Sequence, residues 1–164
     1  MKVRLAGVTH DSIVDGEGLR MVVFAQGCPH HCPGCHNPTT HVPTGGYEAD
    51  TEELLKELAA NTLEQGITLS GGEPFCQCDA MIEIAKGAHA MGKDVWVYSG
   101  YTYDQILSDP AKTALLRECD VLVDGQYVDG LRSLTLRFRG SRNQRVIDVQ
   151  RSLAEKKVIL REDS

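Results

Sequence analysis

The segment Leu19-Arg-Met-Val-Val-Phe-Ala25, followed by Cys28-Pro-His-His-Cys-Pro-Gly-Cys35, decides how this chain is expected to fold. Its first part contains a continuous apolar run, which fits a strand buried on both faces of a parallel sheet. Its second part is rich in cysteine, proline, glycine and histidine, so a loop is expected from Cys28 to Gly46. Three thiols are therefore predicted just past the carboxyl end of a strand, where active sites of such folds gather.

The rest of the chain alternates between strand and helix patterns. Asp50 and Asp79 are the predicted N-caps of two helices. A weaker helical pattern over 102–107 and 111–118 is broken by Pro110. Further strands are predicted at 66–70, 95–98, 121–123, 134–138 and 146–149. This order predicts βαβ units with right-handed crossovers.

A complete eight-fold barrel needs about 250 residues, and this chain has 164. We therefore expect one α/β domain over residues 1–164, built as an incomplete (β/α) barrel that is open along one side.

Composition is that of a soluble globular protein, with 41% apolar and 24% charged residues. The formal net charge of −6 does not suggest nucleic-acid binding. Near the N-terminus the longest apolar run, Met21–Ala25, is too short for a signal peptide or a membrane span. We therefore expect a cytoplasmic protein that binds neither nucleic acid nor membranes. Its six cysteines are expected to be ligands, redox groups or core thiols.

Cys28, Cys32 and Cys35 are the candidate metal ligands. Thiolates are soft ligands that suit iron–sulfur clusters and zinc. A four-iron cluster needs four ligands, so three cysteines would leave one iron open to another molecule. The alternative is a structural zinc site, which spacing alone does not exclude. Its fourth ligand would be His30, His31 or His36.

The spacing Cys-x3-Cys-x2-Cys resembles the hallmark of the radical S-adenosylmethionine superfamily. This resemblance implies that Cys28, Cys32 and Cys35 form a catalytic centre that holds a [4Fe-4S] cluster. The open iron would then chelate the amino and carboxylate groups of S-adenosylmethionine. Gly34, Cys35 and His36 are assigned to cofactor binding by the same resemblance. His36 takes the place of a residue that is usually aromatic and helps to hold the adenine, and it can stack and hydrogen-bond.

Ser70-Gly-Gly-Glu-Pro74 follows the strand predicted at 66–70. Alone, two glycines before an acidic residue indicate a turn. At a strand end they also let backbone carbonyls approach a ligand closely. The segment resembles the Gly-Gly-Glu-Pro motif of the superfamily, which assigns Gly71, Gly72 and Glu73 to the methionyl amino group.

Tyr98-Ser-Gly-Tyr101 ends the next predicted strand at the same face. The resemblance places Ser99 and Gly100 near the methionyl or ribose part of the cofactor. A plain strand-ending turn is the alternative.

Two further segments narrow the family. Asp15-Gly-Glu-Gly-Leu-Arg20 resembles the Asp-Gly-Pro-Gly-x-Arg opening of glycyl-radical activating enzymes, with Glu17 in place of the usual proline. Arg139-Gly-Ser-Arg-Asn-Gln-Arg145 resembles the Gly-Ser-x-Asn-Gln-Arg signature of anaerobic ribonucleotide reductase activating proteins. Resemblance to that family covers nearly the whole chain.

This resemblance implies an oxidoreductase with a protein substrate. A reduced flavodoxin or ferredoxin-type donor would supply an electron, and S-adenosylmethionine would be cleaved reductively at its C5′–S bond. The 5′-deoxyadenosyl radical would then remove a hydrogen atom from a glycine of the anaerobic ribonucleotide reductase. Two alternatives stay open: an activating enzyme for another glycyl-radical enzyme, such as pyruvate formate-lyase, and a small zinc-binding interaction module.

Several other residues carry weaker predictions. Cys76, Cys78 and Cys119 are expected to be spectator thiols, although Cys76-Gln-Cys78 could bind a metal. Asp124, at the end of a predicted strand, is either a ligand for a cation beside the cofactor, as the resemblance suggests, or a solvated carboxylate.

Residues 130–151 contain six arginines and one acidic residue, Asp148. This bias predicts either a docking face for the protein substrate or a solvated surface. The arginines are Arg132, Arg137, Arg139, Arg142, Arg145 and Arg151.

Overall fold

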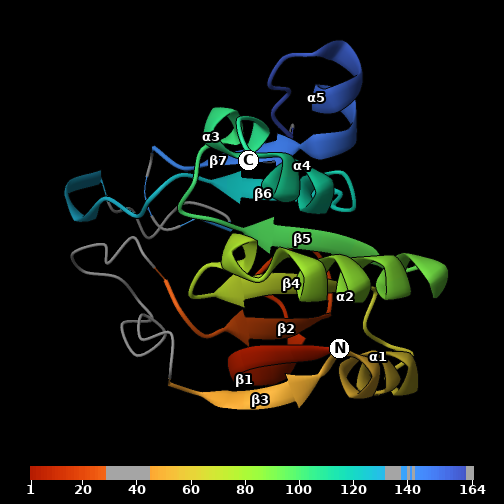
Figure 1. Cartoon of the computed structure of the whole chain (residues 1–164). Coiled ribbons are helices and arrows are strands. Elements are labelled where there is room, and N and C mark those ends of the chain that lie inside the picture. The colour runs from red at the N-terminus through yellow and green to blue at the C-terminus, as the bar shows by residue number, and fades with distance from the viewer. Residues whose placement is uncertain (29–44, 132–137, 140, 142, 162–164) are drawn as a thin grey trace.

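A computed structural model describes residues 1–28, 45–131, 138, 139, 141 and 143–161 of the chain. The strands form one mixed sheet in the order β3-β1-β2-β4-β5-β6-β7 (Figure 1). Their bounds are Lys2–Ser12 for β1, Arg20–Ala25 for β2, Tyr47–Asp50 for β3, Gly66–Gly71 for β4, Asp94–Tyr98 for β5, Val121–Asp124 for β6 and Arg145–Asp148 for β7.

The centre of the sheet is parallel, as the strand–helix alternation predicts. β2, β4, β5 and β6 pair in parallel, whereas β1 is antiparallel to β2 and β3, and β7 is antiparallel to β6. The carboxyl ends of the parallel strands all lie at the left of Figure 1. The sheet is mixed and not closed, because no described pairing joins β3 to β7.

Four predicted strands are confirmed, at β2, β4, β5 and β6. The strand predicted at 146–149 is also present as β7, and it begins and ends one residue earlier. β1 and β3 were not predicted, since the alternation of Val3 and Leu5 with charged neighbours is too short to stand out. Of the strand predicted at 134–138, only Phe138 is described, and its φ of 63° is not that of a strand. Residues 134–137 lie outside the described residues.

Four of the described helices lie in the connections between strands, and α5 follows the last described strand. The helices are α1 (Thr51–Ala60), α2 (Cys78–Ala90), α3 (Tyr103–Leu107), α4 (Pro110–Leu116) and α5 (Val149–Glu155), with 3-10 turns η2 (Pro74–Cys76) and η3 (Asp129–Leu131). Asp50 caps α1 as predicted, accepting from the backbone N of Glu52 at 2.9 Å. Asp79 is not the cap of α2, because η2 leads through Gln77 directly into the helix.

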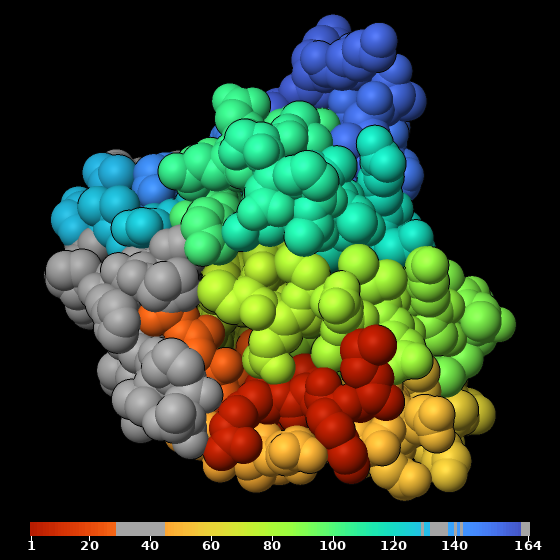
Figure 2. Space-filling model, viewed as in Figure 1, coloured from red at the N-terminus to blue at the C-terminus, as the bar shows by residue number. Residues whose placement is uncertain are grey.

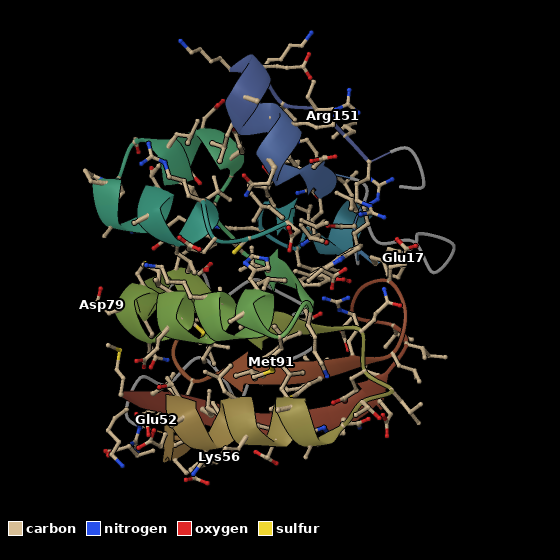
Figure 3. The ribbon with its side chains drawn as sticks, turned by 90° about the vertical axis from the view of Figure 1, so that its right-hand side faces the viewer. Glu17, Glu52, Lys56, Asp79, Met91 and Arg151 are labelled. Carbon is tan, nitrogen blue, oxygen red and sulfur yellow. The ribbon has the colours of Figure 1, made fainter. Side chains whose placement is uncertain are left out.

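One face of the sheet is covered by helices. α1 packs against α2 and α2 against α4, and the side chains of α2 and α4 adjoin in the space-filling view (Figure 2). Seen from the side, α1 and α2 run next to each other over the strands (Figure 3). Met21, Leu69 and Val97 of the strands belong to the buried core on this face.

The opposite face carries a smaller apolar cluster around Trp96. The Trp96 ring meets Phe138 edge-to-face at a centroid distance of 5.0 Å. Because helices fill the other side, ligand-binding groups are expected at the carboxyl ends of the strands or on this face, which none of the described helices α1, α2 and α4 covers. None of the described helices is long and apolar enough to cross a membrane.

Candidate active site

The structure brings the start of the cysteine loop next to the glycine-rich turn after β4. The Gly72 N–H donates to the Ala25 carbonyl at 2.8 Å, and the Glu73 N–H donates to the Gly27 carbonyl at 2.8 Å. These two hydrogen bonds continue the β2–β4 ladder beyond its last strand residues. Cys28 follows Gly27 directly and is half-buried. The first predicted cluster ligand therefore lies beside the turn that the sequence assigns to the cofactor.

The remaining cysteine-loop predictions fall outside the described residues. They concern Cys32, Cys35, Gly34, His36, and the alternative zinc ligands His30 and His31.

Glycine is required at two positions of the turn for a reason that the sequence did not reveal. Gly71 has a φ of 105°, and an added Cβ would lie 2.3 Å from the Ala25 backbone nitrogen. A Cβ on Gly72 would lie 2.4 Å from the Gly27 carbonyl oxygen. Sequence reasoning predicts close approach of a ligand here, whereas the structure shows close approach of the β2 backbone. A substitution at Gly72 is therefore expected to displace the start of the cysteine loop as well.

Glu73 joins the two predicted cofactor-binding turns. Its buried carboxylate accepts from the Ser99 hydroxyl at 2.9 and 3.0 Å and from the Gly100 N–H at 2.8 Å. It also accepts from the Phe75 N–H at 3.2 Å. Since hydrogen bonds to a charged acceptor are strong, this carboxylate fixes the end of β5 against the end of β4. Two turns that were predicted separately thus form one connected unit.

Asp124 is buried and paired, so the solvated-carboxylate alternative is wrong. Its side chain is 1% exposed and accepts from Nε and Nη2 of Arg145 at 3.0 and 2.6 Å. It also accepts from the Tyr103 N–H at 2.9 Å, which anchors the start of α3. The hydrogen bond with Asp124 raises the pKa of Arg145 above its ordinary value. The positive charge beside Asp124 in this structure is therefore that of Arg145.

Sequence reasoning missed that Asn143 and Gln144 lie against the turn after β6. Asn143 Nδ2 donates to the Gln126 carbonyl at 2.8 Å, and Gln144 Nε2 donates to the Gly125 carbonyl at 3.0 Å. The Ser141 hydroxyl donates to Asn143 Oδ1 at 2.6 Å. The complementary charges of Asp124 and Arg145 were a signal of this contact, but nothing in one sequence assigns such a pair.

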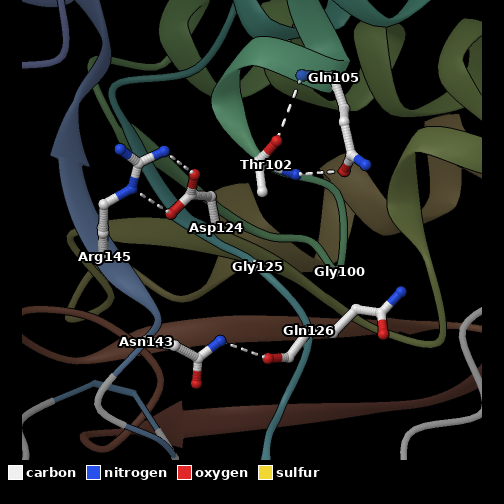
Figure 4. A pocket seen from close by; sticks show the side chains of 8 residues that line it. All are labelled: Gly100, Thr102, Gln105, Asp124, Gly125, Gln126, Asn143 and Arg145. Atoms are coloured by element: carbon white, nitrogen blue, oxygen red, sulfur yellow. Dashed lines mark hydrogen bonds and ion pairs between the residues drawn. The ribbon is translucent and has the colours of Figure 1, made fainter.

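These segments line a pocket of about 420 Å³ (Figure 4). Its lining includes Gly100, one of the predicted cofactor contacts, and the turn after β6. Its lining residues are Gly100, Thr102, Gln105, Asp124, Gly125, Gln126, Asn143 and Arg145.

The docking face predicted from the arginines of 130–151 stays a prediction, and two of the described arginines hydrogen-bond within the chain. Arg139 Nη1 donates to the Gln144 carbonyl at 2.6 Å, and Arg145 is held by Asp124. Arg151 on α5 is exposed and lies 3.8 Å from Glu155 (Figure 3). Arg132, Arg137 and Arg142 lie outside the described residues.

The Asp15–Arg20 segment lies at the other end of the sheet, where the parallel strands begin. Arg20 is fully buried, donating from Nε to Thr68 Oγ1 at 2.8 Å and from Nη2 to the Ile67 carbonyl at 2.8 Å. Its Nη1 lies 2.7 Å from Oδ1 of Asp94. Burial lowers the pKa of Arg20, although Asp94 opposes the shift. This motif braces the sheet at the amino ends of the parallel strands.

The other cysteines have raised pKa values. Burial raises the pKa of Cys78 to about 11, and its thiol donates to the Phe75 carbonyl at 3.1 Å. Partial burial also raises the pKa of the Cys76 thiol, and the nearby charge of Glu73 raises it further. Cys119 is fully buried. Because thiolates are the metal-binding form, these shifts favour the spectator role. In the described ranges no three His, Cys, Asp or Glu side chains are grouped to hold a metal ion.

Comparison with known proteins first defines the class of this site. Residues 14–147 match the family model of the 4Fe-4S single cluster domain. That span contains all three cysteines of the predicted cluster motif and favours iron–sulfur chemistry over zinc.

Relatives then define the family more narrowly. The anaerobic ribonucleoside-triphosphate reductase-activating protein of Salmonella typhi is 36% identical over 141 residues, covering 80% of this chain and 90% of the relative. The proteins of that name from Escherichia coli K12 and phage T4 are each 35% identical, and the alignments cover 90% and 86% of their lengths. The chain belongs to the family of anaerobic ribonucleoside-triphosphate reductase-activating proteins.

Proposed function

We propose that this protein is a radical S-adenosylmethionine oxidoreductase that generates a glycyl radical on anaerobic ribonucleotide reductase. The observation that carries the proposal is the backbone pairing of Gly72 and Glu73 with the end of β2, which sets Cys28 beside the glycine-rich turn. Family membership supports the choice of protein substrate, since the relatives are named as activating proteins of that reductase.

The residues present fit a cluster and its cofactor. Cys28, Cys32 and Cys35 would supply three thiolates and leave one iron open, which suits a ligand that chelates through amino and carboxylate groups. When bound, the reduced cluster and S-adenosylmethionine supply the carbon radical that removes a hydrogen atom from the substrate glycine. A reduced flavodoxin or ferredoxin-type protein would donate the electron.

The remaining cofactor contacts are assigned to the cluster loop and to two strand-ending turns. Gly34 and His36 would lie on the cluster loop, and Gly71–Glu73 would face the methionyl group. The Ser99 hydroxyl and the Gly100 N–H donate to the Glu73 carboxylate. Glu73 therefore positions the turn at Ser99 and Gly100 for the cofactor. Binding groups that are positioned before the ligand arrives reduce the ordering cost of binding.

The proposed architecture is a laterally open (β/α) barrel of the radical S-adenosylmethionine type, in one domain over 1–164 and in the cytoplasm. The open, helix-covered sheet supports it. A glycine within another protein is a bulky substrate, and an unclosed sheet leaves room for it beside the strand ends.

The test is radical transfer. Anaerobically reconstituted, reduced protein with S-adenosylmethionine should produce a glycyl radical on the anaerobic reductase, detected by electron paramagnetic resonance. A radical on pyruvate formate-lyase and none on the reductase would transfer the assignment to another activating enzyme. Tight zinc binding without iron uptake would contradict the radical chemistry altogether.

A further inference from the structure

The 420 Å³ pocket extends away from the proposed cluster site. Its lining includes Gly100, a predicted cofactor contact, and continues across the ends of β6 and β7. Strands in a sheet are spaced by about 4.8 Å. Three steps separate β2, which leads to Cys28, from β6, so this part of the pocket lies on the order of 14 Å across the sheet. A second ligand could therefore occupy it.

The pocket is lined by one acidic and one basic side chain, so its charged groups cancel. Asp124 and Arg145 neutralise each other through two hydrogen bonds. The other polar side chains that line it are the hydroxyl of Thr102 and the carboxamides of Gln105, Gln126 and Asn143. Uncharged hydrogen-bonding groups of this kind suit a ligand of neutral amide chemistry better than a phosphate or a metal ion.

The groups still available for a ligand include donors. Gln105 uses Oε1 to accept from the Thr102 N–H at 2.9 Å, and its Nε2 forms no hydrogen bond with the described part of the chain. Arg145 uses Nε and Nη2 for Asp124, and its Nη1 has no hydrogen-bond partner among the same residues. In Figure 4 the Asp124–Arg145 pair and the two glutamines lie on opposite sides of the pocket. Donors of this kind can bind the carbonyl oxygens of a ligand.

We propose that this pocket binds the main chain of the peptide segment that carries the substrate glycine, with Gln105 and Arg145 donating to its carbonyl oxygens. The inference rests on the proposed function, which requires a glycine of another protein to reach the strand ends. A glycine offers no side chain, so recognition near it depends on peptide N–H and C=O groups. The cavity holds a short segment, not a folded domain.

Gln105→Glu tests the donor without removing the helix cap. Threonine followed three residues later by glutamate is a standard capping box, so Oε1 can still accept from Thr102. The lost Nε2 is replaced by an oxygen that repels a carbonyl. The KM for the reductase should rise about tenfold, as expected for loss of one hydrogen bond together with that repulsion. Ala111→Glu, which adds the same charge at an exposed position of α4 outside the pocket, should leave this KM within about twofold.

The dissociation constant of S-adenosylmethionine separates the peptide from the cofactor. If Gln105→Glu weakened cofactor binding as much as it raised the KM for the reductase, the pocket would belong to the cofactor and the inference would be wrong. An unchanged KM for the reductase would also overturn it.

A second measurement does not depend on the identity of the partner. Titration of the cluster-loaded protein with acetyl-Gly-Gly-Gly-amide should shift the side-chain amide resonances of Gln105 and Gln126 in NMR spectra. In Gln105→Glu the Gln126 shift should require about tenfold more peptide. Absence of any shift in the wild type would contradict the pocket assignment. Failure of the proposed function would show itself separately, as a wild-type protein with an intact cluster that does not cleave S-adenosylmethionine.

Discussion

Two arginine–aspartate pairs lie at opposite ends of the parallel strands, and their burial is reversed. At the amino ends, the Arg20 side chain is 0% exposed and Asp94 is 41% exposed. At the carboxyl ends, Asp124 is 1% exposed and Arg145 is 37% exposed. The same ion pair is therefore built once around a buried cation and once around a buried anion.

The difference corresponds to two tasks. Arg20 directs its donors to Thr68, to the Ile67 carbonyl and to Asp94, and lies 5.6 Å from the Trp96 ring centre, so it braces the amino ends of the parallel strands. Arg145 donates to Asp124 and also lines the pocket. The pair with the buried arginine stabilises the fold, whereas the pair with the buried aspartate lines a pocket.

Removing the buried cation should have the largest effect on stability. Arg20→Ala leaves a cavity and unpaired groups on Thr68 and Ile67, so the free energy of unfolding should fall by about 3–5 kcal/mol. Anaerobic urea unfolding measures it. Lys56→Ala, at a side chain that is 73% exposed, is the control and should change stability by less than about 0.5 kcal/mol. A loss below about 1 kcal/mol for Arg20→Ala would show that Arg20 does not brace the amino ends of the strands.

Arg145→Ala should cost less, about 2 kcal/mol, because water reaches the position of its partly exposed side chain. Arg145→Lys keeps the charge but loses the two-point contact, and it should recover part of the loss. The measurement is again the free energy of unfolding. Equal losses of unfolding free energy for Arg20→Ala and Arg145→Ala would contradict the different roles assigned to the two ion pairs.

Ser99→Ala removes one donor to the buried Glu73 carboxylate and should cost about 1–2 kcal/mol. Thermal unfolding under anaerobic conditions would detect it. Ser108→Ala is the matched control, because its hydroxyl donates to the Gln105 carbonyl at an exposed position. If both serines proved equally tolerant, Glu73 would not depend on Ser99 to join β4 and β5.

The smallest effect concerns His10, which contacts Glu64 at 3.1 Å and Glu57 at 3.4 Å. Burial lowers the pKa of His10, but the hydrogen bonds with Glu64 and Glu57 outweigh it, so the pKa is raised overall. The protonated form is thus favoured by folding, and its stabilisation is full below pH 6.5 and lost as pH rises through the folded pKa. Solvent screening limits it to about 0.5 kcal/mol.

Stability of wild type relative to His10→Gln, measured from pH 5.5 to pH 8, should therefore decline with rising pH. An advantage that grew toward pH 8 would have the wrong sign for a raised pKa.

Local pattern was sufficient for the central strands and for the cap at Asp50, because burial on both faces and capping leave marks in adjacent residues. It also indicated the turns at Gly71–Glu73 and Ser99–Gly100. It could not show that Glu73 joins those turns, or that Arg145 neutralises Asp124, since both contacts link residues more than 20 positions apart. The Asp79 cap was wrong because a 3-10 turn leads into α2.

Iron content tests most directly whether the loop beside the glycine-rich turn holds the cluster. After anaerobic reconstitution, the wild type and Cys76→Ala should each bind about four irons per chain, whereas Cys28→Ala should retain no stable cluster. Cys76 is the matched control, since it lies after the same turn but has a raised pKa. If Cys76→Ala lost iron as completely as Cys28→Ala, or if Cys28→Ala kept its iron, the site described here would not be the cluster site.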